Sequence, residues 1–123
     1  MTTVFSMTAS HNVHDVHVKT KKDRLFVIDI YEASTGVYDS TVTVLDRISI
    51  QPCSGLYKTT PTSSLASDNF KAAVEFVQKY LGSVDSSDSI TEIHNPCNCP
   101  FVFEADQNTI VNSLGLPLKV RVN

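Results

Sequence analysis

The sequence has little glycine and none of the short motifs that mark nucleotide-binding and common hydrolytic enzymes. Only four of its 123 residues are glycine, too few for the glycine-rich loops that cradle phosphates. It contains no G-x-G-x-x-G, no G-x-x-x-x-G-K-[ST] and no G-x-S-x-G, so dinucleotide, nucleoside-triphosphate and serine-hydrolase chemistry have no support. These absences predict a protein that is not an enzyme and that carries no cofactor.

A strong charge of one sign is missing, and so is any long apolar run. The formal net charge is −3, which gives no basis for general attraction to nucleic acid or to anionic membrane. No stretch approaches the roughly 20 apolar residues that a membrane-spanning helix needs. We therefore expect no membrane partner and find little support for nucleic acid. The one basic cluster, Lys19, Lys21, Lys22 and Arg24, is typical of a charged hairpin turn.

Cysteine is scarce and odd in number. The three residues are Cys53, Cys97 and Cys99, and the last two are too close in sequence for a comfortable mutual disulfide. The first residues show neither a basic segment nor a sustained apolar run, so they do not resemble a secretory signal. We therefore expect free thiols and a cytoplasmic protein, located in the host cell if the protein is viral.

One long helical pattern is present, in the stretch SDNFKAAVEFVQKYLG at residues 67–82. Its apolar residues recur at helical spacing and form a single stripe: Phe70, Ala73, Val74, Val77 and Leu81. Ser67 is placed to cap the first turn, and Gly82 suits the left-handed residue just past the end. We predict a helix over about residues 67–81 that buries this stripe.

Much of the remaining chain alternates like β-strands. Residues 24–31 are apolar on both faces, which predicts a central strand, and residues 41–50 alternate between apolar and hydroxyl side chains. Further strands are expected within residues 4–18, 90–94, 101–105 and 116–122. The predicted fold is a single α+β domain over residues 1–123. It consists of an antiparallel β-sheet of about 5–6 strands with one main α-helix packed on one face.

Two connecting segments are expected to be irregular and solvated. Residues 51–64 are rich in Pro, Gly, Ser and Thr, which predicts a loop that carries the chain from the sheet to the helix. Residues 83–89 are polar, and their two aspartates, Asp85 and Asp88, are expected to be exposed.

The C-terminal stretch predicts an edge strand that could pair with a partner. Residues 109–114 indicate one helical turn closed by the glycine that follows. Residues 116–122 then alternate, and Pro117 lacks the N–H that a central strand needs. The outward charges Lys119 and Arg121 are of the kind that discourages random pairing at sheet edges. This edge could add a strand from a protein partner or form a homodimer with a second copy. The alternative is a covered or frayed terminus, and the sequence does not separate the two.

Two aromatic side chains, Phe76 and Tyr80, flank the apolar stripe and widen it. They could pack beneath a curved sheet, or they could form an exposed aromatic edge, since aromatic residues are enriched at protein interfaces. The sequence does not separate these alternatives. The candidate partner-binding residues are therefore Phe76, Tyr80, Lys119 and Arg121.

The loop HNPCNCP brings together donors that zinc prefers, namely His94, Cys97 and Cys99. A fourth ligand would have to be Cys53 or a distant histidine, and C-x-C is not the usual C-x2-C spacing. Asp15 and His17 share a strand face and could also chelate a metal, although a solvated face is the commoner explanation. We predict no metal site and keep the His94 loop with Cys53 as the rival hypothesis.

These observations favour a small non-enzymatic module that works by protein–protein contact, of the inhibitor or immunity type. The main support for this interpretation is the lack of catalytic motifs and of a strong charge field. The first alternative is a structural subunit of a viral or other homomeric assembly, which low charge and Ser/Thr/Val-rich strands would suit. The second is a metal-binding protein or metal-dependent enzyme that uses His94, Cys97 and Cys99.

Overall fold

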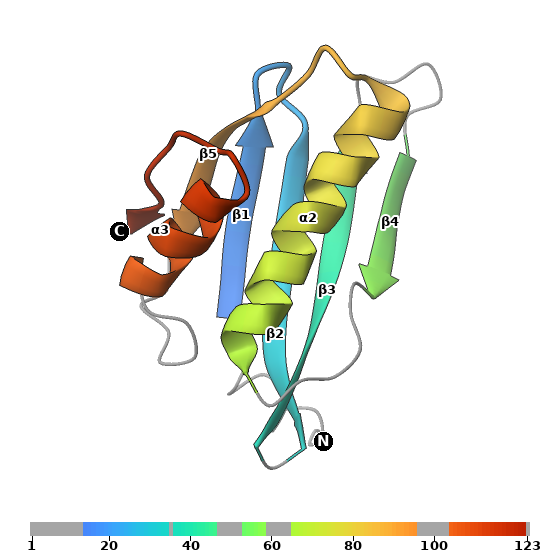
Figure 1. Ribbon diagram of the computed structural model, residues 1–123. Helices are drawn as coiled ribbons and strands as arrows, with labels where there is room; N and C mark the ends of the chain where they lie inside the picture. The colour runs from blue at the N-terminus through green and yellow to red at the C-terminus, as the bar shows by residue number, and fades with distance from the viewer. Residues whose placement is uncertain (1–13, 35, 47–52, 59–64, 96–103, 123) are drawn as a thin grey trace.

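The structure is a computed structural model that describes residues 14–34, 36–46, 53–58, 65–95 and 104–122. Within these residues, six strands and two helices follow in the order β1 (His14–Thr20), β2 (Leu25–Ser34), β3 (Val37–Asp46), β4 (Cys53–Lys58), α2 (Ala66–Val84), β5 (Ile90–Asn95), α3 (Glu104–Ser113) and β6 (Arg121–Val122). The strands form one sheet in the order β4-β3-β2-β1-β5-β6 (Figure 1). The predicted α+β class is confirmed.

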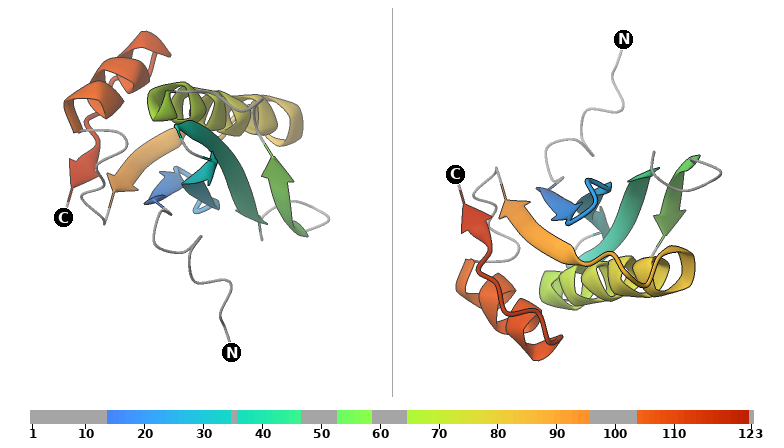
Figure 2. Two further views of the ribbon diagram at one scale, coloured as in Figure 1. Left: turned by 90° about the horizontal axis from the view of Figure 1, so that it is seen from below. Right: turned by 90° about the horizontal axis from the view of Figure 1, so that it is seen from above.

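Neighbouring strands are antiparallel from β4 through to β5, and β6 alone runs parallel to its neighbour β5. Both helices lie on the same face of the sheet (Figure 2). The β-meander of β1 to β3 follows from short turns, because antiparallel strands need only a few residues to reverse direction. Gly36, with φ of +72°, supplies the left-handed conformation in the turn between β2 and β3.

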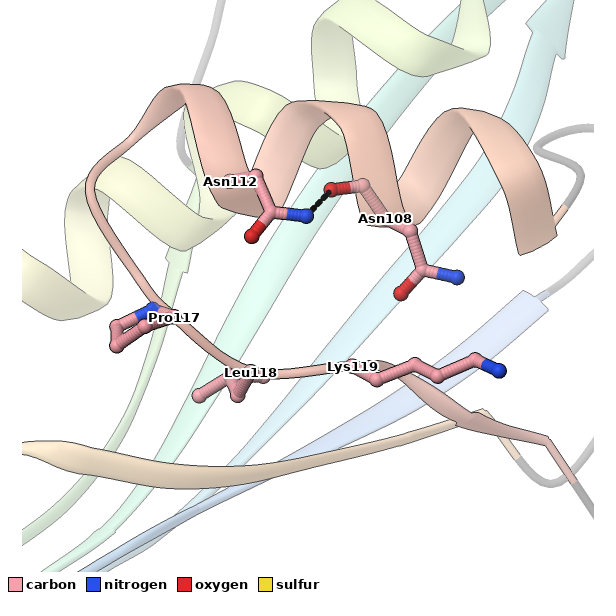
Figure 3. Close-up of a pocket in the computed structure, with 5 residues that line it drawn as sticks. All are labelled: Asn108, Asn112, Pro117, Leu118 and Lys119. Carbon is pink, nitrogen blue, oxygen red and sulfur yellow. Dashed lines mark hydrogen bonds between the residues drawn. The ribbon is translucent and has the colours of Figure 1, made fainter.

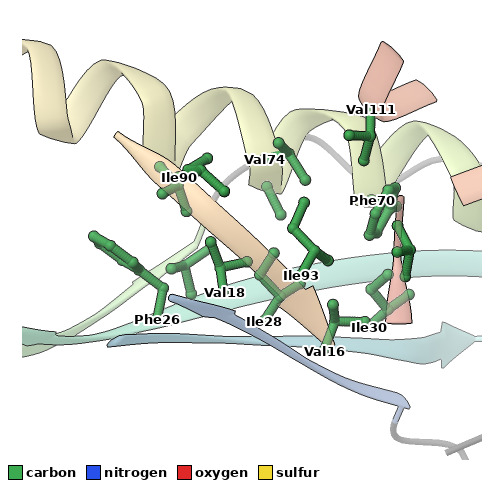
Figure 4. Close-up of a cluster of buried hydrophobic side chains, with 14 of the residues drawn as sticks. Val16, Val18, Phe26, Ile28, Ile30, Phe70, Val74, Ile90, Ile93 and Val111 are labelled. Atoms are coloured by element: carbon green, nitrogen blue, oxygen red, sulfur yellow. The ribbon is translucent and has the colours of Figure 1, made fainter. Parts of the chain in front are cut away.

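The core lies between the sheet and α2. The inward side chains of the central strands are fully buried, among them Val16, Val18, Phe26, Ile28, Ile30, Val42 and Val44. They meet the helix stripe of Phe70, Ala73, Val74, Val77 and Leu81, all of which are buried. Figure 4 shows Phe70 and Val74 among the side chains between the helix and the strands. Strand alternation and helical periodicity therefore predict the same core from two sides, and the predicted stripe is confirmed.

The ends of α2 differ from the prediction. The helix begins at Ala66 and its N-cap is Leu65, which makes no side-chain capping hydrogen bond, so Ser67 is not the cap. Gly82 does not end the helix either, since it lies within the last turn and Asp85 is the C-cap. The helix continues because the Asp85 N–H bonds the Leu81 carbonyl oxygen at 2.8 Å.

Strand β4 is the main element that the sequence does not predict. Residues 53–58 pair with β3 over six positions, from Thr41 opposite Lys58 to Asp46 opposite Cys53. The segment CSGLYK contains Ser and Gly, which favour turns locally. The hydrogen bonds of the β3 ladder outweigh that local preference, because β-strand formation depends strongly on its neighbours.

The C-terminal part also differs from the prediction. Glu104 and Ala105 begin helix α3 instead of ending a strand, and α3 runs to Ser113, longer than the single turn expected. Gly115, with φ of +85°, closes the helical segment as predicted. Only Arg121–Val122 forms ladder pairs in the stretch expected to be a seven-residue strand, although it does lie at the edge of the sheet. Parts of the strands predicted within residues 4–18, 41–50 and 101–105, namely residues 4–13, 47–50 and 101–103, lie outside the described residues.

Candidate functional site

A buried cluster of charges closes one end of the sheet. Arg24, which precedes β2 and is 2% exposed, places Nη1 at 2.8 Å from Asp88 Oδ2. The same nitrogen lies 3.1 Å from Asp85 Oδ2, and Nε lies 3.0 Å from Asp46 Oδ2. The Tyr80 hydroxyl donates to Asp46 Oδ2 at 2.7 Å. The guanidinium thus joins β3, α2 and the segment before β5.

Two carboxylates of this cluster, Asp85 and Asp88, are held in their charged form. Burial by itself raises the pKa of Asp88, but hydrogen bonds from Thr20 and Arg24 outweigh it and lower the pKa. The pKa of Asp85 is lowered by hydrogen bonds from Ser87, Lys22 and Arg24. Each charge already has a partner, so the cluster holds the fold together and presents no free acid or base for catalysis.

This cluster corrects two expectations from the sequence. The basic residues Lys22 and Arg24 are not only a charged turn, because both bind carboxylates from a distant segment. Asp85 and Asp88 do not form a solvated loop, since Asp88 is only 6% exposed. A sequence signal existed in Asp46, which interrupts an inward strand face and needs a buried cation as its partner.

The opposite face of the sheet carries no helix within the described ranges (Figure 2). Asp15 of β1 and Asp29 of β2 are direct cross-strand partners on this face. Burial, followed by the hydrogen bond and charge repulsion from Asp15, raises the pKa of Asp29 to about 7. Asp29 therefore holds a proton up to about pH 7, because its burial and the neighbouring Asp15 disfavour its charged form.

Two histidines meet beside this acid pair. His17 of β1 and His94 of β5 are cross-strand partners, and their ring centroids lie 6.1 Å apart in an edge-to-face arrangement. Cys53 lies on β4, and three strands separate β4 from β5. At about 4.8 Å per strand the separation is roughly 19 Å, so the structure does not bring Cys53 to His94. Cys97 and Cys99 lie outside the described residues.

Phe76 and Tyr80 belong to a row of aromatic rings that runs from the core to the surface. Tyr80 meets the buried Phe26 edge-on at 5.4 Å between centroids, and Phe76 lies 6.5 Å from Tyr80. Tyr57 of β4 completes the row, with its ring 5.2 Å from Phe76. Tyr57 is 39% exposed, whereas Phe76 and Tyr80 are half-buried. The outermost ring of this row therefore comes from the strand that the sequence did not predict.

The two edges of the sheet are unequal. Strand β4 has six residues, and no strand in the described part of the chain pairs with its outer side. Strand β6 has two residues, Arg121 is paired with Glu92 at 2.6 Å, and the Val120 N–H donates to Asn108 Oδ1 of α3 at 2.7 Å. Less of the C-terminal edge is therefore open for pairing than the sequence suggests.

Lys119 lines a pocket of about 550 Å³ beside α3. Asn108 and Asn112 of the helix form one wall, and Pro117 and Leu118 lie opposite (Figure 3). The Asn112 amide donates to the Asn108 carbonyl oxygen at 2.8 Å, and Asn108 Oδ1 is bound to Val120. Among the described residues that line the pocket, Lys119 is the one charged side chain.

The sequence matches no protein-family model, and neither the curated proteins nor the solved structures give a match. None of the helices described in the structure has the length and apolar character needed to cross a membrane.

Proposed function

We propose that this protein is a small non-enzymatic module that acts by protein–protein contact, of the inhibitor or immunity type. The observation that supports this proposal best is the outer edge of β4 with the Tyr57 ring beside it. An edge strand offers a row of backbone N–H and C=O groups to an extended segment of another protein. Tyr57 adds a large, partly exposed ring of the kind that contributes strongly to interfaces.

The β4 edge is a better candidate than the C-terminal edge. Natural edge strands are protected by short length, proline and charge. The C-terminal edge has all three, because β6 is only two residues long, Pro117 precedes it and Arg121 carries a charge. Lys119 and Arg121 remain a secondary candidate surface. Phe76 and Tyr80 support Tyr57 from behind, so their contribution to partner binding would be indirect.

The test is site-specific photocrosslinking of the full chain in an extract of its native host. A photoreactive phenylalanine analogue replaces Tyr57, Lys119 or, as a control on the solvent side of α3, Asp106. We expect a discrete protein adduct from position 57 and none from position 106. Adducts of equal yield at positions 57 and 106, or an adduct from position 119 alone, would contradict the β4 surface.

The first alternative, a structural subunit of a homomeric assembly, would use the same edge, because two β4 strands could pair about a two-fold axis. Light scattering of the purified protein separates the two proposals. A monomer over the concentration range of the crosslinking experiment supports a different protein as the partner. A large symmetric particle would end the inhibitor proposal.

We also propose a cytoplasmic location, which the odd number of cysteines supports. Thiol titration of the denatured protein, prepared without reductant under argon, should find three free thiols. A result of one free thiol would reveal a disulfide and reverse this proposal.

A further inference from the structure

We infer that His17 and His94 form a two-imidazole site for a late first-row transition ion such as Zn²⁺, Cu²⁺ or Ni²⁺. This inference does not depend on the proposed partner surface. The two histidines belong to separate motifs in the sequence. They are brought together on neighbouring strands and on the same face of the sheet, as direct partners in the β1–β5 ladder.

The ring spacing suits a shared ion. An ion held about 2.1 Å from one nitrogen of each imidazole would place the two ring centres roughly 5–6.5 Å apart. The observed spacing of 6.1 Å falls within that range. Both side chains project from regular strands, so only their side-chain torsions need to adjust for two nitrogens to face one ion.

A second observation points to a ligand. His94 Nε2 is buried and has no hydrogen-bond partner in the described structure. A buried polar atom without a partner costs free energy, and a bound ion is one of the few explanations for such an atom in a native protein. Imidazole nitrogen is the commonest protein ligand for Zn²⁺, Cu²⁺ and Ni²⁺.

Two cations, Lys19 and Arg121, lie near the pair, and the Glu92 carboxylate lies opposite Lys19 and binds Arg121. Arg121, opposite His94 on β6, is paired with Glu92, which offsets its positive charge. The acid pair of Asp15 and Asp29 lies further along the same face.

The donor set also limits the site. No group of three or more His, Cys, Asp or Glu able to hold a metal occurs among the described residues, so the protein supplies two ligands here. Water would fill the remaining positions. The site should therefore bind less tightly than a four-ligand structural zinc site, and it should not select Mg²⁺ or Ca²⁺, which require oxygen ligands.

The test is calorimetric titration of the full chain with Zn²⁺ in a non-coordinating buffer. We expect binding of one ion per chain, weakened at least tenfold by His17→Ala and by His94→Ala. The matched control is His14→Ala on the same strand, which should stay within twofold of the parent. Parent-like affinity in either His17→Ala or His94→Ala would overturn the inference.

Two further measurements cover the other outcomes. The double variant Cys97→Ser with Cys99→Ser should keep the parent affinity, and loss of binding there would assign the ion to the cysteine loop instead. If a histidine variant does not fold, NMR of the parent with labelled histidines replaces it. Zn²⁺ should shift or broaden the imidazole signals of His17 and His94 before those of the other two histidines, and the opposite order would refute the site.

Discussion

Arg24 is the residue on which the closure of the sheet end depends. Its guanidinium is buried and contacts three carboxylates, those of Asp46, Asp85 and Asp88. Taking such a charge out of water is costly, so the pairing contributes only while all partners are present. Removing the guanidinium should lower the free energy of unfolding strongly, since each buried carboxylate would lose its counter-ion.

We predict that Arg24→Met lowers the free energy of unfolding by about 3–5 kcal/mol, because it leaves buried carboxylates without a cation. The matched control is Arg121→Met, which breaks an exposed ion pair with Glu92 and should cost less than about 1 kcal/mol. Urea denaturation at pH 7 measures both. Equal, small losses would mean that water reaches the Arg24 cluster.

Asp29 gives the sheet face a pH dependence of unusual sign. Its pKa in the folded protein is raised to about 7, above the value near 4 that it has when unfolded. Between these values the folded state holds a proton that the unfolded state has released, so stability falls as pH rises from about 4 to 7. Because the acid pair is partly exposed, we expect a loss of about 1 kcal/mol after allowance for solvent screening.

The variant Asp29→Asn should remove this dependence and raise stability at pH 8 relative to the parent. Denaturation midpoints compared at pH 5 and pH 8 provide the measurement. Asp106→Asn, an exposed change on α3, should retain the parental trend. The prediction is wrong if the stability of the parent rises between pH 5 and pH 8 and does so by the same amount as that of the Asp29→Asn variant. That result would show that the acid pair is fully solvated.

At the scale of the elements, the two helices end in different ways. Helix α2 runs through Gly82 in ordinary helical conformation, with open space where a Cβ would lie. The segment after α3 turns at Gly115, whose φ of +85° is strained for any residue with a side chain. The same substitution should therefore have opposite effects at the two glycines.

We predict that Gly82→Ala stabilises the protein by about 0.5–1 kcal/mol, because alanine restricts the unfolded chain and favours the helix. Gly115→Ala should destabilise it by about 1 kcal/mol, because the left-handed conformation then carries a Cβ. Thermal unfolding of the two variants beside the parent gives the comparison. A stabilising Gly115→Ala would mean that the turn adopts another conformation in solution.

At the scale of the whole molecule, the described residues form two layers around one core. The buried apolar residues of the described chain form one contiguous cluster that joins the sheet, α2 and α3. The fold has no second core to support a separate unit in this part of the chain, so the layers should unfold together. Val77, fully buried at the middle of the helix stripe, reports on that cooperative transition.

We predict that Val77→Ala costs about 1–3 kcal/mol through lost apolar transfer and a residual cavity. Chemical denaturation should show a single transition with a lower midpoint and an unchanged slope, as expected for a two-state loss of stability. Lys79→Ala on the exposed side is the control and should stay within about 0.5 kcal/mol of the parent. A loss near zero for Val77→Ala would mean that the stripe is not buried.

The sequence by itself determined the features that depend on local periodicity. The helix stripe, the inward faces of the central strands and the glycine at 115 follow from spacing that the chain repeats every two or 3.6 residues. These patterns were sufficient for the α+β class and for the face of α2 that packs on the sheet.

The tertiary structure decided everything that depends on which distant segments meet. Strand β4 exists because β3 supplies its ladder, and Arg24 finds Asp88 across 64 residues. Neither pairing produces a periodic pattern in the sequence, since a single buried ion pair or edge contact involves too few residues to impose one. The meeting of His17 and His94 has the same origin, because strand order in a sheet is set by packing the whole chain.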